Sequence, residues 1–191
     1  MRFESRVVSF ESDPIYSELK TQNSKLLDII SMKLEFVLDG KLVQLDLEPQ
    51  ETLAEVLRNR CHRTGLKVSC EVQVCGACTA LVDDLPVSAC TYLAYEARGR
   101  RVTTIEGIGD GERLHPIQKA FLDEFAFQCG FCTPGMILAA KALLHENAEP
   151  TDAEVVNYMD GNLCRCTGYL PILRAIRRAA ALMRDRERER P

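Results

Sequence analysis

Residues 70–90, CEVQVCGACTALVDDLPVSAC, carry the densest motif of the sequence, with cysteines at positions 70, 75, 78 and 90. Three of these thiols fall within nine residues, in the CxxxxCxxC spacing that is typical of plant-type [2Fe-2S] ligation. Gly76 has no Cβ, so backbone amides can approach the sulfurs there. Four buried thiols or a zinc site are the alternatives, but zinc frameworks usually pair two CxxC or CxxH units. The motif therefore predicts a loop that wraps a two-iron cluster, with the ligands Cys70, Cys75, Cys78 and Cys90.

Alternating strand patterns surround this motif. Apolar residues alternate along residues 32–38 and again along 41–47, and Asp39-Gly40 between them is typical of a type I′ hairpin turn. A short amphipathic helix is predicted directly after Thr52, because apolar residues recur there at helical spacing. Further strands are predicted at residues 79–83, 85–87 and 102–105. The pattern predicts an α+β domain over residues 32–107, which ends at a glycine-rich stretch.

Helical periodicity dominates the remainder of the chain. Helices are predicted from Leu114, over residues 136–144, after the capping box Thr151-Asp-Ala-Glu154, and from Pro171. Their short connections predict an all-α four-helix bundle over residues 113–184. Residues 185–191 are predicted to be a charged, solvated tail. Residues 1–31 are polar and weakly periodic, and we assign this N-terminal extension no function.

A second cysteine set lies within the helical half, at Cys129, Cys132, Cys164 and Cys166. Cys132 precedes Thr133-Pro134, which we predict to be an N-cap and the first helical residue. Cys166 comes five residues before Pro171. Both sulfur pairs are thus predicted near helix N-termini, whose positive dipole ends favour an anionic cluster. The spacing alone is compatible with zinc as well as with iron.

Composition and charge restrict the classes of function. The chain has 191 residues, a formal net charge of −4 and nine cysteines. It has no basic footprint for nucleic acid and no apolar run long enough for a membrane span. The sequence contains no secretory or twin-arginine signal pattern, which predicts a cytoplasmic protein whose thiols stay reduced. Cys61, the ninth cysteine, is predicted to be a small buried apolar residue.

Together, CEVQVCGACTALVDDLPVSAC, QCGFCTPGM and NLCRCTGY resemble the small iron–sulfur subunit of the molybdenum hydroxylases, a family that includes xanthine dehydrogenase, aldehyde oxidoreductase and carbon monoxide dehydrogenase. The resemblance extends from about Met32 to about Met183, and eight cysteines match in order and spacing. It implies a β-grasp, ferredoxin-like [2Fe-2S] domain followed by a helical-bundle [2Fe-2S] domain. It also implies iron rather than zinc at the second set.

The resemblance further implies partners and site residues. A large subunit would hold molybdopterin and a medium subunit would hold FAD, with electrons passing through the bundle cluster and then the ferredoxin-like cluster to flavin. Gln128 matches a glutamine that hydrogen-bonds the pterin, and Cys166 matches a ligand whose sulfur approaches the pterin amino group. The family acts on purines, aldehydes, carbon monoxide, aromatic CoA esters and N-heterocycles, so the resemblance predicts the role of the chain in a complex and no substrate.

Two alternatives stay open on the sequence. The chain could belong to a flavin-free enzyme of two subunits that passes electrons to an external acceptor. From a different class, it could be a zinc-stabilised interaction module, which the CxxC and CxC pairs permit on ligand chemistry alone.

Overall fold

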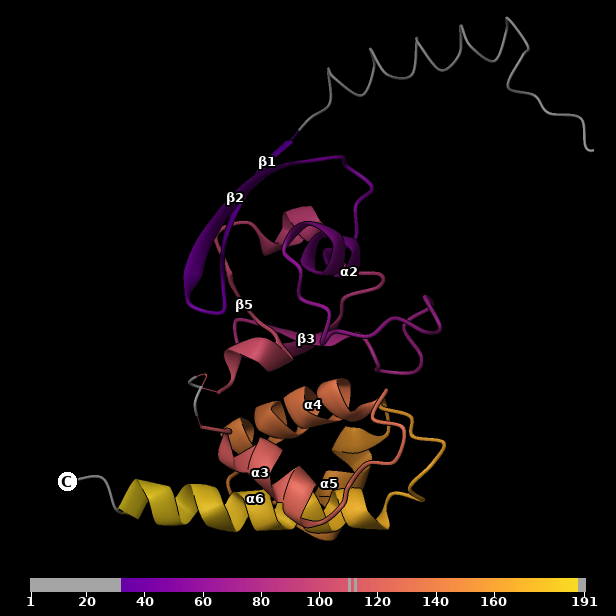
Figure 1. Ribbon diagram of the computed structural model, residues 1–191, viewed down its shortest axis with the longest axis vertical. Helices are drawn as coiled ribbons and strands as arrows, with labels where there is room; N and C mark the ends of the chain where they lie inside the picture. Colours follow the sequence, from indigo (N-terminus) through magenta and orange to yellow (C-terminus); the bar gives the residue numbers. More distant parts are fainter. Residues whose placement is uncertain (1–31, 110, 112, 189–191) are drawn as a thin grey trace, which may run out of the picture.

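The computed structural model describes residues 32–109, 111 and 113–188. The extension predicted at 1–31 and residues 189–191 of the predicted tail lie outside these residues. Figure 1 shows a half built on a sheet and a half built from helices, with α4 (Thr133–Glu146) lying nearest the sheet. The fold class predicted from the sequence, a β-grasp domain followed by a helical domain, is confirmed.

The sheet has five strands in the order β2-β1-β5-β3-β4. β1 (Met32–Leu38) and β5 (Arg101–Thr103) pair in parallel, and the other neighbouring strands pair antiparallel. The strand bounds are Lys41–Leu47 for β2, Thr79–Val82 for β3 and Leu85–Ser88 for β4. The turn between β1 and β2 has positive φ at both Asp39 and Gly40, as a type I′ turn requires. The predicted hairpin is therefore confirmed.

Burial along the strands follows their position in the sheet. β1 buries Leu34, Phe36 and Leu38 on one face, because it lies inside the sheet and packs on the core. β2 keeps the same alternation, but it is an edge strand, and of its inward residues Val43 and Leu45 are only partly covered while Leu47 is buried. β3 is buried on both faces, because Leu81 packs against α4 while its neighbours face the core of the sheet half.

The helix predicted after Thr52 is present and covers one face of the sheet. Thr52 and Glu55 form a capping box at the start of α2 (Leu53–Glu55). The helix continues at once as a π-helical turn, Val56–Arg60. Short 3-10 turns, Ala94–Ala97 and Ile105–Gly107, lie on either side of β5.

Four helices build the second half: α3 (Pro116–Asp123), α4, α5 (Asp152–Met159) and α6 (Leu170–Arg188). Their facing side chains form one apolar core. α4 is buried almost all round, as its sequence predicted, because Leu138 and Ala142 on its other side pack against Leu81 of β3. This small third cluster joins the helical half to the sheet half.

Of the four helix starts predicted in this half, one agrees with the sequence and three differ, since α3 begins at Pro116 rather than Leu114. The Thr151–Glu154 capping box is present at α5. At α4, however, Cys132 itself is the N-cap and Thr133 is already helical, so the predicted Thr133 cap is wrong by one residue. α6 begins at Leu170 rather than Pro171. Proline fits any position of the first turn, whose N–H groups have no intrahelical acceptor, so it does not fix the first residue.

Candidate metal centres

The first cysteine loop is shaped by residues with left-handed backbone angles. Glu71, Gln73 and Gly76 all have positive φ, so the chain between Cys70 and β3 turns tightly on itself. As a result, the backbone N–H groups of Val74 and Cys75 both donate to Cys70 Sγ at 3.4 Å. Backbone hydrogen bonds from Val72, Val74 and Cys75 lower the pKa of Cys70 to about 6.

Cys78 and Cys90 close the same site from the sheet. Cys78 directly precedes β3 and is buried, and Cys90 follows β4. Burial raises the pKa of Cys78 to about 12, and the neighbouring thiols of Cys90 and Cys75 add to the increase. The structure thus brings together the four cysteines that the sequence predicted as the first ligand set.

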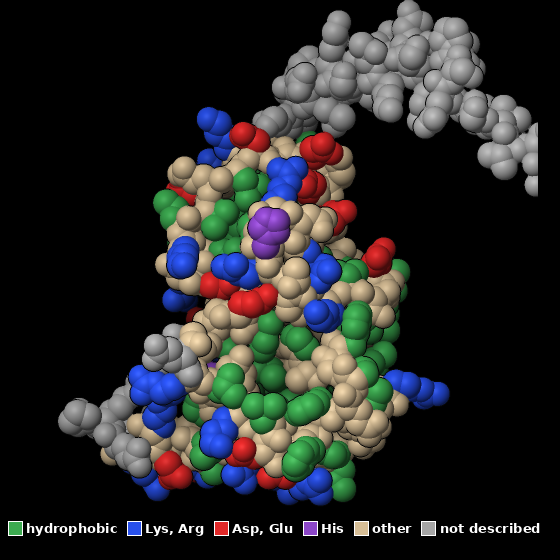
Figure 2. Space-filling model, viewed as in Figure 1, with side chains coloured by type: hydrophobic (Ala, Val, Ile, Leu, Met, Phe, Trp, Pro, Cys, Tyr) green, Lys and Arg blue, Asp and Glu red, His purple; other side chains and the backbone are tan. Residues whose placement is uncertain are grey.

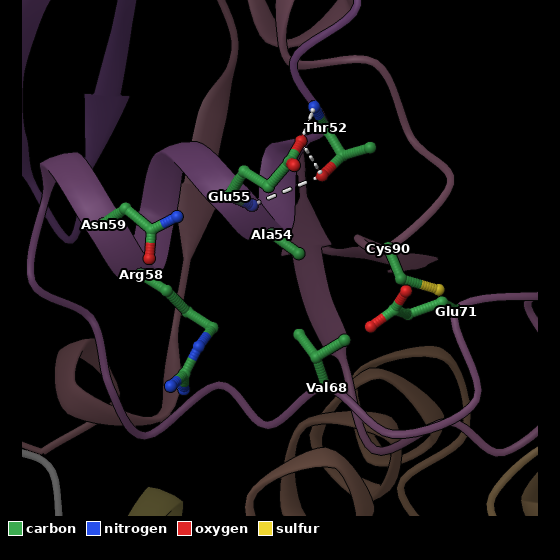
Figure 3. A pocket seen from close by; sticks show the side chains of 8 residues that line it. All are labelled: Thr52, Ala54, Glu55, Arg58, Asn59, Val68, Glu71 and Cys90. Carbon is green, nitrogen blue, oxygen red and sulfur yellow. Dashed lines mark hydrogen bonds between the residues drawn. The ribbon is translucent and has the colours of Figure 1, made fainter. Parts of the chain in front are cut away.

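A pocket borders this site without enclosing it. Figure 3 shows Cys90 and Glu71 at one end of the pocket and Arg58 and Asn59 of the helical turn at the other. The capping box of Thr52 and Glu55 forms its upper wall. Cys90 is the only one of the four cysteines that lines the pocket. The pocket therefore lies beside the cysteine loop and is not the space between the four sulfurs.

The second site gathers its sulfurs from two junctions of the bundle. Cys129 and Cys132 precede α4, and Cys164 and Cys166 precede α6. The sulfurs of Cys129 and Cys166 lie 3.6 Å apart, and both residues are exposed. Burial raises the pKa of Cys132 to about 12, and the adjoining thiol of Cys164 adds to the increase. The two pairs therefore form an outer and an inner edge of one site.

Gln128, the other residue predicted to contact a pterin, lies at the outer edge. It is exposed and comes directly before Cys129, whose sulfur neighbours that of Cys166. The structure therefore leaves both residues of this prediction, Gln128 and Cys166, exposed in the helical half.

The two cysteine sites touch each other through a contact that the sequence did not predict. Leu163 N, next to Cys164, donates to Cys75 O at 2.9 Å. The buried side chain of Asn162 donates to Gly76 O at 3.0 Å and to Thr79 Oγ1 at 3.2 Å. No sequence signal marked Asn162, because its partners are more than 80 residues away along the chain.

The glycine at position 76 is required by this contact as well as by the loop. A Cβ there would lie 2.4 Å from Asn162 Nδ2 and 2.5 Å from Gly161 O. Gly135 in α4 is similarly confined, since a Cβ would lie 2.2 Å from Gly76 O. The first cysteine loop therefore packs backbone to backbone against the elements that carry Cys132 and Cys164.

The sulfurs are grouped in pairs, and this fits a two-iron ligand set. The pairs are Cys70 with Cys75, Cys78 with Cys90, Cys129 with Cys166, and Cys132 with Cys164. A [2Fe-2S] cluster takes four cysteine thiolates shared between its two irons. Among the described residues, no three His, Cys, Asp or Glu side chains are grouped for a single ion.

His115 and Cys61, which belong to neither cysteine set, have structural roles. His115 caps α3, its Nδ1 accepting from Ile117 N at 3.3 Å, and burial lowers its pKa. Cys61 packs against the core of the sheet half, where burial raises the pKa of its thiol. No helix within the described residues is long and apolar enough to cross a membrane.

Comparisons with known proteins agree with this geometry. Residues 36–102 match the model of a 2Fe-2S iron-sulfur cluster binding domain, and residues 104–177 match that of a [2Fe-2S] binding domain. The small subunit of nicotine 6-hydroxylase from Paenarthrobacter nicotinovorans is 43% identical over 145 residues, which are 76% of this chain and 87% of that protein. A probable xanthine dehydrogenase subunit of Bacillus subtilis is 44% identical over 143 residues, 75% of this chain and 82% of that protein.

A solved structure shows the same fold. The crystal structure of quinoline 2-oxidoreductase from Pseudomonas putida 86 superposes with a TM-score of 0.78 at 42% identity, covering 82% of this chain and 98% of that one. The family of this chain follows from three findings. Both 2Fe-2S domain models match it, relatives are covered over most of their length, and its two cysteine sites lie on the matching elements. The chain belongs to the family of small iron–sulfur subunits of the molybdenum hydroxylase oxidoreductases.

Proposed function

We propose that this chain carries one [2Fe-2S] cluster in each half, residues 32–107 and 113–184, and conducts electrons between two partner subunits. The observation that carries the proposal is the double set of paired sulfurs, Cys70, Cys75, Cys78 and Cys90 in one half and Cys129, Cys132, Cys164 and Cys166 in the other. When bound, such clusters accept and release one electron at a time.

The chain's own residues hold the two sites close together. Leu163 N and the Asn162 side chain bind the backbone of the first cysteine loop directly. The inner pair, Cys132 and Cys164, is more buried than the outer pair, Cys129 and Cys166, which is exposed. The arrangement supports a through-protein electron route whose outer end is open to a partner.

Exposed apolar side chains of the helical half, among them Phe131 between Cys129 and Cys132, support a partner there. Figure 2 shows apolar side chains gathered over the helical half. Apolar residues of this half remain exposed, among them Leu122, Phe125, Phe131, Leu163 and Leu170. A contiguous apolar surface marks an interaction site. We propose that a molybdopterin-binding large subunit covers it, with Gln128 and Cys166 contacting the pterin.

The first site offers a second exposed end. Val72 and Val74, in the loop between Cys70 and Cys75, are 65% and 59% exposed. We propose that an FAD-binding medium subunit receives electrons here. A flavin-free enzyme of two subunits is the remaining alternative, and copurification of a flavin subunit from the native host distinguishes them. The proposal includes a cytoplasmic location, where reducing conditions keep the thiols available for iron.

The test is cluster content, measured on protein purified anaerobically. We expect about four irons and four acid-labile sulfides per chain, the content of two [2Fe-2S] clusters, and two reduced EPR signals. Cys78→Ser should remove one signal and Cys132→Ser the other, whereas Cys61→Ser, the matched control, should remove neither. A colourless protein that holds zinc after anaerobic preparation would overturn the proposal and favour the structural module.

A further inference from the structure

We propose that Thr167 is a positioning residue that raises the reduction potential of the second site by donating hydrogen bonds to the sulfur of Cys164. This inference rests on the proposed function, namely that the second site holds a [2Fe-2S] cluster. It concerns a side chain that is neither a predicted ligand nor a predicted pterin contact.

Thr167 approaches Cys164 with two polar groups. Its hydroxyl oxygen lies 3.2 Å from Cys164 Sγ, and its backbone N–H donates to the same sulfur at 3.5 Å. Both groups come from the turn between Cys164 and α6, so one residue supplies a side-chain donor and a backbone donor to one sulfur.

The direction of the hydroxyl hydrogen bond follows from the state of the sulfur. Tyr169 N donates to Thr167 Oγ1 at 3.2 Å, so the oxygen accepts there and its own proton is free to donate elsewhere. A cysteine that ligates iron is a thiolate and has no proton to donate. With a cluster bound, the threonine hydroxyl is therefore the donor to Cys164 Sγ and the sulfur is the acceptor.

Tyr169 closes the turn back on Cys164. The backbone N–H of Cys164 donates to Tyr169 Oη at 2.9 Å. Gly168 and Tyr169 both have positive φ, which folds the chain so that the tyrosine reaches back. Cys164, Thr167 and Tyr169 thus form a closed set of hydrogen bonds, which holds the hydroxyl beside the sulfur.

The electrostatic consequence has a definite sign. Cys164 is 9% exposed, so solvent screens these hydrogen bonds only weakly. Reduction adds negative charge to the cluster and its sulfur ligands, and hydrogen-bond donors stabilise that charge. Removing the threonine hydroxyl should therefore make the second site harder to reduce, while the first site stays unchanged.

The experiment is an EPR-monitored redox titration of the cluster-loaded full chain. Thr167→Val removes the hydroxyl and keeps the backbone N–H and the shape of the side chain, and Thr167→Ser keeps the hydroxyl. Thr91→Val is the matched control, because Thr91 follows Cys90 but its hydroxyl contacts Gln73 and Ser88 and no sulfur. We expect a more negative second-site potential in Thr167→Val alone, and wild-type potentials for both sites in the other two variants.

Each other outcome would count against the inference in a distinct way. Equal second-site potentials in Thr167→Val and wild type would overturn it and leave the proposed function intact. An equal shift in Thr167→Ser would assign the effect to packing. If Thr167→Val and Thr167→Ala both lose the second signal while Thr167→Ser keeps it, the hydroxyl holds Cys164 in place and has no tuning role. Wild-type protein without iron in the helical half would overturn the proposed function and, with it, this inference.

Discussion

The two cysteine sites of this protein are assembled by different means. The first takes three of its four sulfurs from nine consecutive residues, and backbone amides surround Cys70. The second takes its sulfurs from two junctions separated by 31 residues, which meet only because α4 and α6 pack in one bundle. At Cys164, a threonine side chain contributes to the hydrogen bonding of the sulfur.

This difference shows which forces each site depends on. A loop with left-handed residues can place its sulfurs by local backbone geometry. Sulfurs at helix junctions are placed by the packing of the helices. A defect in that packing therefore changes the positions of the sulfurs. The contact of Asn162 and Gly76 is where the two kinds of site are joined.

The largest expected loss of stability comes from Gly76→Ala, because Gly76 lies at the contact between the two cysteine sites. The new Cβ would lie 2.4 Å from Asn162 Nδ2 at a residue with φ +68°. We expect a loss of about 2–5 kcal/mol in the free energy of unfolding, from backbone strain and overpacking together. Chemical denaturation and the EPR signals of both sites measure it.

Gly99→Ala is the matched control for this variant. Gly99 has φ +72°, but a Cβ there would meet nothing within 4 Å. It should cost only the backbone strain, about 1–2 kcal/mol, and leave both signals intact. Equal losses in the two variants would show that the contact with Asn162 contributes nothing.

A smaller loss of stability is expected from Asn162→Ala, which removes the side-chain contact between the two sites but changes no cysteine. The buried amide loses its bonds to Gly76 O and Thr79 Oγ1, which should cost about 1–3 kcal/mol in urea denaturation. Because the second site depends on packing, its EPR signal should broaden more than that of the first.

Asn59→Ala is the control for this variant. Asn59 lies at an exposed position of the π-helical turn, so the free energy of unfolding should stay within about 0.5 kcal/mol of wild type. Broadening confined to the first signal would contradict this account.

The capping boxes at Thr52 and Thr151 sharpen the comparison, because each supports one half through bonds between Thr and Glu that involve no sulfur. Thr52→Ala and Thr151→Ala should each cost about 1 kcal/mol in the free energy of unfolding, with both EPR signals unchanged. The backbone N–H of Thr52 and, after it, the Thr52 hydroxyl lower the pKa of Glu55 below its usual 4.5, and Thr52→Ala removes the contribution of the hydroxyl. The contribution of this carboxylate is therefore complete above the unfolded pKa and is lost as the pH falls through the folded pKa. Urea titrations at a series of pH values should show less difference between Thr52→Ala and wild type at low pH; a constant difference would contradict the prediction.

The smallest effect is expected from Cys61→Ala. Cys61 packs at the edge of the core of the sheet half and belongs to neither sulfur group. Its removal should change the free energy of unfolding by less than about 1 kcal/mol and leave the iron content unchanged. A fall in iron per chain would assign this ninth thiol to a site.

Patterns that depend on near neighbours were predictable from the sequence. The type I′ turn at Asp39-Gly40 and the capping boxes at Thr52 and Thr151 are local structures, and all three are present. Helix starts were less accurate, because a proline fits more than one position of the first turn and so does not fix the first residue of α4 or α6.

The sequence by itself determined the order of strands and helices, the two cysteine sets and the family, because spacing, periodicity and turn chemistry act over a few residues. Only the tertiary structure decided that Cys129 pairs with Cys166 and Cys132 with Cys164, and that Asn162 joins the two sites. It also decided that α4 is covered by the sheet on one side and by the bundle on the other. These features depend on close packing between segments far apart in the chain, and a local pattern does not specify which distant surface will fill a given space.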